Sequence, residues 1–186
     1  MRALYNLLGG ILAWNDQTVP DFPKLRAFPL LGSAAEIFHQ AMDMERGAYH
    51  FYREVLARHS EAAFARFIDM LARAEEGHAR LIYGYYAQEV PDAPPFDELY
   101  AALPGEVLEG GQSLAAMRSL LDSRENTTCI DIVELAISIE YAAYDLYRSM
   151  ADHFQGTGRE EAFLDIAQAE KEHMRIAAEA LACCEE

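Results

Sequence analysis

Cysteine is scarce in this sequence, and its scarcity limits the chemistry that thiols could support. The chain has three cysteines, Cys129, Cys183 and Cys184, and no C-x-x-C pair. A zinc or iron–sulfur site with four thiolate ligands is therefore excluded. Three cysteines also give no even disulfide framework, and this usage is typical of a reducing compartment. We expect a cytoplasmic protein in which Cys183 and Cys184 are inert neighbours at a frayed terminus.

Basic residues and long apolar runs are also lacking. The chain has 15 Lys and Arg residues and 31 Asp and Glu residues, which gives a formal net charge of −16. Such a charge repels the phosphates of nucleic acids and the surface of anionic membranes. No apolar run approaches the roughly 20 residues that a membrane-spanning helix needs. We therefore expect neither a nucleic acid nor a membrane as a partner.

Helical periodicity dominates from residue 33 onward. Apolar residues recur at helical spacing in four segments, at about 33–58, 60–90, 128–154 and 160–182. Ser33 and Glu36 form a helix-start signal, and Pro91 stops the second segment. Residues 91–127 are rich in proline and glycine, which is typical of a long crossover with one or two short helices. We predict an all-α four-helix bundle in which this crossover joins a hairpin at 33–90 to a hairpin at 128–184.

The sequence repeats itself at a separation of 95 residues without a gap. In this register MERGAYHFYR (44–53) aligns with IEYAAYDLYR (139–148), and LARAEEGHAR (71–80) aligns with IAQAEKEHMR (166–175). Each half carries a glutamate on its first helix and a Glu-x-x-His motif on its second. The residues concerned are Glu45, Glu75 and His78 in the first half and Glu140, Glu170 and His173 in the second.

The spacing of these six residues predicts a shared metal site. Residues three apart on a helix lie on one face, so each Glu-x-x-His motif directs an oxygen and a nitrogen to the same place. Glu45 and Glu140 occur within apolar stripes that face the core, where four unpaired carboxylates would repel one another strongly. Two divalent or trivalent metal ions would remove this repulsion. Carboxylate and imidazole ligands suit iron or manganese better than a metal that prefers thiolates.

The paired motifs also resemble a known family. AEEGHA and AEKEHM on the second helices, with MERGAYHFY and IEYAAYDLY on the first helices, are similar to the rubrerythrin branch of the ferritin-like superfamily. The resemblance covers about residues 33–184. It implies a centre of two iron ions (Fe2+/Fe3+), for which manganese or zinc could substitute, with the six residues as ligands and Glu75 and Glu170 as the bridges. It also implies a homodimer.

Two features depart from the rubrerythrin pattern. Rubrerythrins carry a rubredoxin domain with two C-x-x-C pairs, which this sequence lacks, so we expect a separate redox protein as electron donor. Rubrerythrins also have an extra glutamate one turn beyond the ligand of the third helix, whereas Ile137 and Ala143 flank Glu140 here. This second departure weakens the expectation of a redox-linked iron shift and of efficient peroxidase chemistry.

Two pairs of tyrosines follow the glutamates of the first helix in each half. Tyr52 and Tyr147 come seven residues after these glutamates, and Tyr49 and Tyr144 come four residues after them. Both spacings keep the tyrosines close to the ligand stripe. They could donate hydrogen bonds to ligand carboxylates or scavenge radicals, and core packing is the alternative. We assign Tyr52 and Tyr147 to the surroundings of the site.

The leading hypothesis for function is a di-iron oxidoreductase of the peroxidase or ferroxidase type. The enzyme would reduce hydrogen peroxide or dioxygen in defence against oxidative stress, with its six ligands acting through the metals. A second hypothesis is iron handling, in which ferrous iron is the substrate and is passed on or stored. A third is a non-enzymatic metal-binding module. The negative net charge favours any role that attracts cations.

The first 28 residues have a different pattern. The stretch YNLLGGILAWN (5–15) contains the only tryptophan, Trp14. Its L-x-G-G-x-x-A-W pattern resembles the end of a rhodanese (sulfurtransferase) domain, which implies a fusion protein or the remnant of one. The C-x-x-G-x-R loop of a rhodanese is missing, so we expect no sulfurtransferase activity. We therefore divide the chain into a rhodanese-tail-like segment at 1–28 and the bundle at 29–186, and we expect Trp14 to pack on the bundle or on a second subunit.

Overall fold

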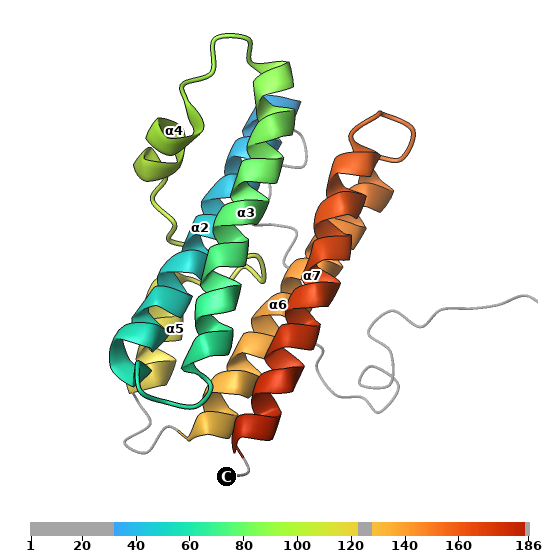
Figure 1. Ribbon diagram of the computed structural model, residues 1–186. Helices are drawn as coiled ribbons and strands as arrows, with labels where there is room; N and C mark the ends of the chain where they lie inside the picture. The colour runs from blue at the N-terminus through green and yellow to red at the C-terminus, as the bar shows by residue number, and fades with distance from the viewer. Residues whose placement is uncertain (1–31, 123–127, 185–186) are drawn as a thin grey trace, which may run out of the picture.

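The computed structural model describes residues 32–122 and 128–184, and these residues form helices without a β-strand. Four long helices make two antiparallel hairpins that pack side by side (Figure 1). Their bounds are Ala34–His59 for α2, Ala65–Glu89 for α3, Cys129–His153 for α6 and Glu160–Leu181 for α7. The predicted all-α bundle of two hairpins is confirmed. None of the described helices is long and apolar enough to span a membrane.

Two of the long helices begin with a capping box. At the start of α2 the hydroxyl of Ser33 accepts a hydrogen bond from the amide of Glu36 (3.3 Å). The carboxylate of Glu36 in turn accepts one from the amide of Ser33 (2.7 Å). Thr128 and Asp131 form the same arrangement at the start of α6. Each box satisfies amides that would otherwise lack a partner in the first turn of the helix.

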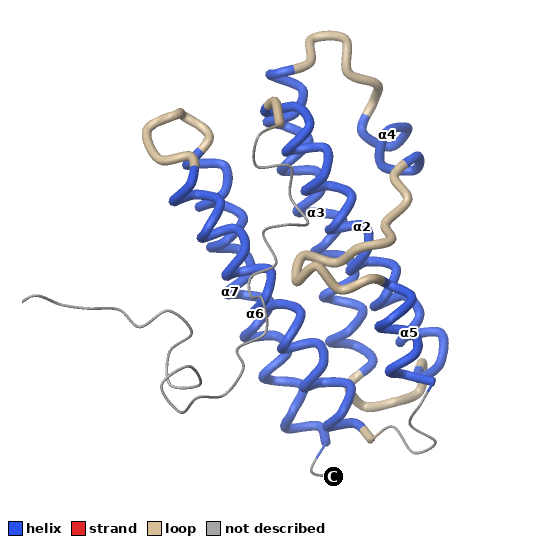
Figure 2. Tube along the Cα trace, turned by 180° about the vertical axis from the view of Figure 1, so that it is seen from behind, coloured by secondary structure: helices blue, strands red, loops and turns tan. Residues whose placement is uncertain are grey.

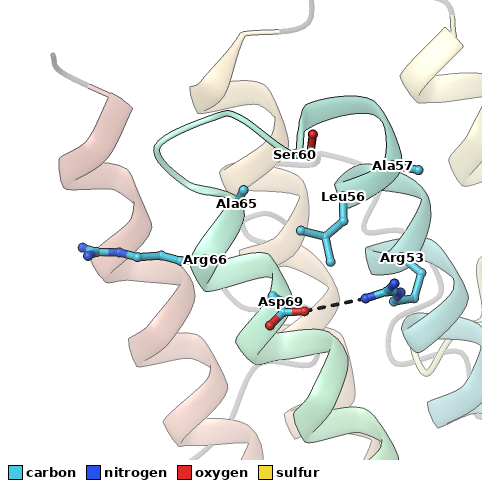
Figure 3. A pocket seen from close by; sticks show the side chains of 7 residues that line it. All are labelled: Arg53, Leu56, Ala57, Ser60, Ala65, Arg66 and Asp69. Carbon is cyan, nitrogen blue, oxygen red and sulfur yellow. Dashed lines mark ion pairs between the residues drawn. The ribbon is translucent and has the colours of Figure 1, made fainter.

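The turn between α2 and α3 is longer than the sequence pattern predicts. Ser60 follows the C-terminal end of α2, and α3 begins at Ala65 rather than near Ser60. An open pocket of about 400 Å³ lies beside this turn, where Arg53 and Asp69 form an ion pair at 3.6 Å (Figure 3). Both partners are partly exposed, so the pair contributes little to stability. None of the predicted ligands lines this pocket.

The core consists of two apolar clusters, one toward each end of the bundle. One cluster contains Ile37 and Phe38 of α2 with Phe163 of α7. The other contains Phe51 of α2 and Ile132 of α6. All four long helices contribute to both clusters, so the layer between the clusters crosses each helix near its middle.

The connection between the hairpins runs from one end of the bundle to the other beside α2 (Figures 1 and 2). It contains two short helices, α4 (Phe96–Ala102) and α5 (Leu114–Asp122), as predicted for the crossover. Between them the chain makes a tight turn that is closed by a bridge between Val107 and Ser113. This turn reaches toward the middle of the bundle (Figure 2).

A disulfide joins Cys129 at the start of α6 to Cys184, which follows α7. Cys183 beside it is a free thiol. The prediction that Cys183 and Cys184 are inert neighbours is therefore wrong for Cys184. An odd number of cysteines does not exclude one bond, and the antiparallel hairpin brings together two residues that lie 55 positions apart in the sequence.

Reduction of this disulfide is expected to lower the free energy of unfolding by about 2 to 4 kcal/mol, because the bond restricts a long loop of the unfolded chain. Denaturant unfolding with and without a thiol reductant measures the difference. Cys183→Ser keeps the bond and is the matched control, whereas Cys129→Ser should reproduce the reduced protein. Equal stability of the oxidised and reduced forms would contradict the expectation.

Candidate metal centre

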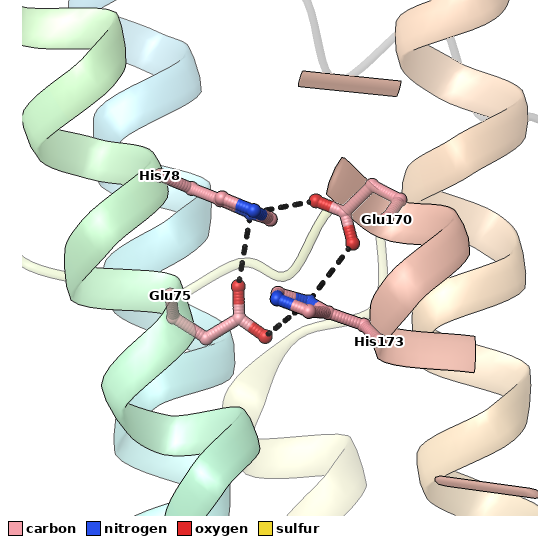
Figure 4. Close-up of side chains that lie close together, drawn as sticks. All are labelled: Glu75, His78, Glu170 and His173. Carbon is pink, nitrogen blue, oxygen red and sulfur yellow. Dashed lines mark ion pairs between the residues drawn. The ribbon is translucent and has the colours of Figure 1, made fainter. Parts of the chain in front are cut away.

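The six predicted ligands meet at the centre of the bundle, in the layer between the two apolar clusters. The side chains of α2 and α6 contribute one glutamate each, and α3 and α7 contribute one Glu-x-x-His motif each. All are buried, with exposed fractions of 6% or less: Glu45, Glu75, His78, Glu140, Glu170 and His173. One ligand atom from each member of the two Glu-x-x-His motifs lies within 4.8 Å of the other three (Figure 4).

One half of the cluster surrounds His78. Its Nδ1 atom lies 2.8 Å from Oε1 of Glu170 and 3.4 Å from Oε2 of Glu45. The distance from the same atom to Oε2 of Glu75 is 3.8 Å. Three carboxylates from three helices therefore face one imidazole nitrogen. These four side chains could hold one metal ion.

The other half has the same arrangement around His173. Its Nδ1 atom lies 2.9 Å from Oε2 of Glu140 and 3.2 Å from Oε2 of Glu170. The distance to Oε1 of Glu75 is 3.9 Å. The internal repeat of the sequence is thus reproduced as a repeat of the site, with Glu140 and His173 in the places of Glu45 and His78.

Glu75 and Glu170 lie between the two halves. Each of them directs one oxygen toward His78 and its other oxygen toward His173. The two imidazole rings stack, with centroids 4.4 Å apart and an angle of 13° between their planes. A carboxylate that offers one oxygen to each of two positions has the geometry that a bridging ligand requires. Glu75 and Glu170 therefore lie between the two imidazoles, and their role as bridges stays a prediction.

Two buried tyrosines contact the remaining carboxylates across the bundle. Tyr52 of α2 donates a hydrogen bond to Oε1 of Glu140 of α6, and Tyr147 of α6 donates one to Oε1 of Glu45 of α2. Burial raises the pKa of both phenols well above the usual value, and the facing glutamates raise it further. Both hydroxyls therefore remain protonated donors. They orient the two carboxylates and link α2 to α6.

Burial and crowding control the ionisation of the cluster in the metal-free protein. Burial raises the pKa of Glu75 well above its usual value, and the neighbouring glutamates add to this effect. Burial also raises the pKa of Glu140 to about 7, although His173 opposes it. At Glu170 burial is outweighed by His78 and His173, which lower its pKa to about 2. The carboxylates in turn raise the pKa of His173 to about 9, and that of His78 well above its usual value, against the effect of burial.

Several buried oxygens of the cluster lack a hydrogen-bond partner among the described residues. They include Oε2 of Glu45 and both oxygens of Glu170, which approach the imidazoles without hydrogen-bond geometry. Buried carboxylate oxygens without partners cost several kcal/mol. Cations placed among them would remove this cost, and a set of carboxylates with two imidazoles suits iron or manganese. The residues present therefore fit a pair of metal ions.

A further carboxylate, Glu109, was missed by the sequence analysis. It lies in the tight turn between α4 and α5 and is 1% exposed. A carboxylate oxygen of Glu109 lies within 4.8 Å of ligand atoms of Glu45 and Glu75. Burial and the charge of Glu45 raise its pKa well above the usual value. The only signal in the sequence was the apolar pair Val107 and Leu108 before it, which marks a part of the crossover that returns to the core.

A helical bundle with a buried layer of glutamates and histidines is the arrangement of ferritin-like metal proteins. A protein-family model described as Rubrerythrin matches residues 131–185, so the second hairpin is similar to that family. Shifted back by the 95 residues of the internal repeat, the matched range falls on residues 36–90 (131 to 36, 185 to 90), which is the first hairpin. No curated protein and no solved structure matches the chain. The rhodanese-like segment at 1–28 lies outside the matched range and outside the described residues, and it stays a prediction.

Replacing Tyr52 or Tyr147 with phenylalanine is expected to weaken metal binding by about tenfold, because loss of a group that orients a ligand has this order of effect. Each substitution removes one hydroxyl and keeps the ring that packs in the core. Competition between the protein and a chelator for Mn²⁺ measures the affinity. Tyr144→Phe is the matched control, because Tyr144 is only partly buried and no described hydrogen bond joins it to a ligand carboxylate. Unchanged affinity in both variants would mean that the tyrosines only fill space.

Proposed function

We propose that this protein is a di-iron oxidoreductase that reduces hydrogen peroxide or dioxygen with electrons from a separate redox protein. The strongest support is the position of Glu75 and Glu170, each with one oxygen toward each of two stacked imidazoles. When bound, a pair of iron ions supplies two electrons from two adjacent one-electron centres, which is what cleavage of an oxygen–oxygen bond requires. The rubrerythrin-like match over the second hairpin supports the choice of iron.

The residues of the chain would hold and isolate this pair. His78 with Glu45 would bind one ion, and His173 with Glu140 would bind the other. Glu75 and Glu170 would contact both. The apolar clusters on either side exclude water from the ends of the site and strengthen its electrostatic interactions. Tyr52 and Tyr147 would keep Glu140 and Glu45 in place when the charge of the ions changes.

Rapid mixing of the reduced protein with peroxide tests the proposal. Protein produced in iron-replete cells is reduced with dithionite under anaerobic conditions and then mixed with hydrogen peroxide. We expect the near-ultraviolet absorption of a diferric centre to rise quickly, with one peroxide consumed per pair of iron ions, and a second addition of dithionite to restore the reduced state. A reduced protein that does not react with either peroxide or dioxygen would overturn the proposal.

The number of iron ions oxidised separates this function from iron handling. An oxidoreductase keeps its two ions, so excess ferrous iron in the presence of dioxygen should leave about two ferric ions on each chain. An iron-handling protein would instead oxidise many ferrous ions per chain. A chain that binds the metals tightly and stays inert toward peroxide would be a binding module.

A further inference from the structure

The connection between the hairpins places an additional carboxylate beside Glu45 and Glu75 of the metal centre. The group of acidic side chains that contains Glu109 includes Glu45 and Glu75, and their ligand atoms lie within 4.8 Å of one another. Glu45 faces His78, whereas Glu140, which faces His173, is not in this group. Neither histidine belongs to the group, so its link to the metal position beside His78 is made by Glu45. The internal symmetry of the two hairpins is therefore broken at the site by a residue that lies outside both hairpins.

The turn that carries Glu109 is fixed against α2. Gly47 of α2 lies so close to the turn that a Cβ atom on it would be 2.4 Å from the carbonyl oxygen of Val107. The amide of Gly105 donates a hydrogen bond to Oδ1 of Asp43, also on α2, at 2.8 Å. Leu108 is completely buried in one of the two apolar clusters. These contacts hold the backbone that leads into Glu109, whose side chain lies in the cluster.

The side chain of Glu109 has no partner that explains its position. It is 1% exposed, and neither of its carboxylate oxygens has a hydrogen-bond partner among the described residues. A buried carboxylate in this state costs several kcal/mol or takes up a proton. A structural role would be met at lower cost by glutamine or leucine. A cation held by Glu45 and Glu75 would give this carboxylate a partner.

We propose that Glu109 is a ligand of the metal ion held by Glu45, Glu75 and His78, so that the two ions have unequal ligand sets. This inference rests on the metal centre of the proposed function. The position of His78 carries one more negative charge than the position of His173, and it therefore binds its ion more tightly. The two positions fill in sequence rather than together.

Titration of the metal-free protein with Mn²⁺ tests the assignment without any redox reaction. We expect two binding steps of different affinity in the wild-type protein. Glu109→Gln should weaken the tighter step by at least about tenfold and leave the weaker step unchanged. Glu106→Gln is the matched control, because Glu106 belongs to the same turn and is exposed. Two steps with wild-type affinities in the Glu109→Gln variant would overturn the inference.

A second variant keeps the carboxylate and moves the turn. Gly47→Ala places a methyl group where it must displace the carbonyl of Val107, and it should weaken the same binding step. The unfolding temperature of each metal-free variant reports on folding, so a loss of metal binding can be separated from a loss of structure. A wild-type protein that binds two Mn²⁺ ions in unequal steps but, as the iron form, reacts with neither peroxide nor dioxygen would overturn the proposed function and leave Glu109 as a ligand. A wild-type protein that binds no Mn²⁺ would overturn both.

Discussion

Replacing Glu170 with glutamine is expected to remove both metal ions and to lower peroxide or dioxygen reduction by at least about 100-fold. Glu170 is completely buried, and its two oxygens lie 2.8 Å and 3.2 Å from Nδ1 of His78 and His173. Although burial opposes ionisation, the two imidazoles lower the pKa of Glu170 to about 2, so this carboxylate stays charged. A neutral amide cannot bridge two cations. The expected effect therefore exceeds the roughly 10- to 100-fold that follows loss of a residue behind a ligand.

Metal analysis of the purified variant and its single-turnover rate with peroxide measure this effect. Glu172→Gln is the matched control, because Glu172 lies on the same helix, is exposed and pairs with Arg175. The control should keep both ions and the wild-type rate. Two tightly bound ions in the Glu170→Gln variant would contradict the bridging role.

The metal-free protein is expected to lose stability as the pH rises from about 5 to 9. Burial raises the pKa of Glu75 well above 4.5 and that of Glu140 to about 7, so the stability that depends on their protons is lost as the pH rises through these values. The carboxylates raise the pKa of His173 to about 9 against the effect of burial, so its contribution is complete below 6.5 and lost by about 9. The pKa of Glu170 is lowered, so its contribution to stability has the opposite pH dependence. That contribution is lost only as the pH falls from 4.5 toward 2. Because one pKa unit corresponds to about 1.4 kcal/mol, the loss between pH 5 and 9 should amount to several kcal/mol.

Denaturant unfolding of the metal-free protein at several pH values measures this dependence. Addition of Mn²⁺ should restore stability at the alkaline end, because metal ions compete with protons for the same oxygen and nitrogen atoms. Glu75→Gln should flatten the profile, since it removes a buried carboxyl group with a raised pKa. Metal-free stability that stays level or increases across this range would contradict the expectation.

The four long helices and the six ligands could be predicted because local and repeated patterns specify them. Apolar residues at helical spacing extend over more than 20 residues in each long helix, and the start at Ser33 has a complete capping box. The ligands are polar residues on otherwise apolar helix faces. The repeat shows that the same polar residues interrupt the apolar faces of both hairpins. A carboxylate such as Glu45 at a core position needs a partner, so its presence points to a cation.

The remaining features depend on contacts between segments that no local pattern connects. Glu109 reaches the site because Gly47 allows a turn of the crossover to lie against α2, and neither residue stands out in the sequence. The tyrosines could be placed near the ligand stripe, but their pairing with the glutamate of the opposite hairpin depends on how α2 and α6 face each other. The disulfide between Cys129 and Cys184 depends in the same way on the packing of α6 against α7.

Native mass spectrometry of the iron-loaded protein tests most directly whether the four helices hold a pair of metal ions. The ligand set predicts two iron ions per chain, and it predicts none in a variant that carries both His78→Ala and His173→Ala. The Glu172→Gln protein should keep both ions. One iron ion per chain in the wild-type protein, or two ions that persist in the double variant, would contradict the assignment of this cluster as a dinuclear centre.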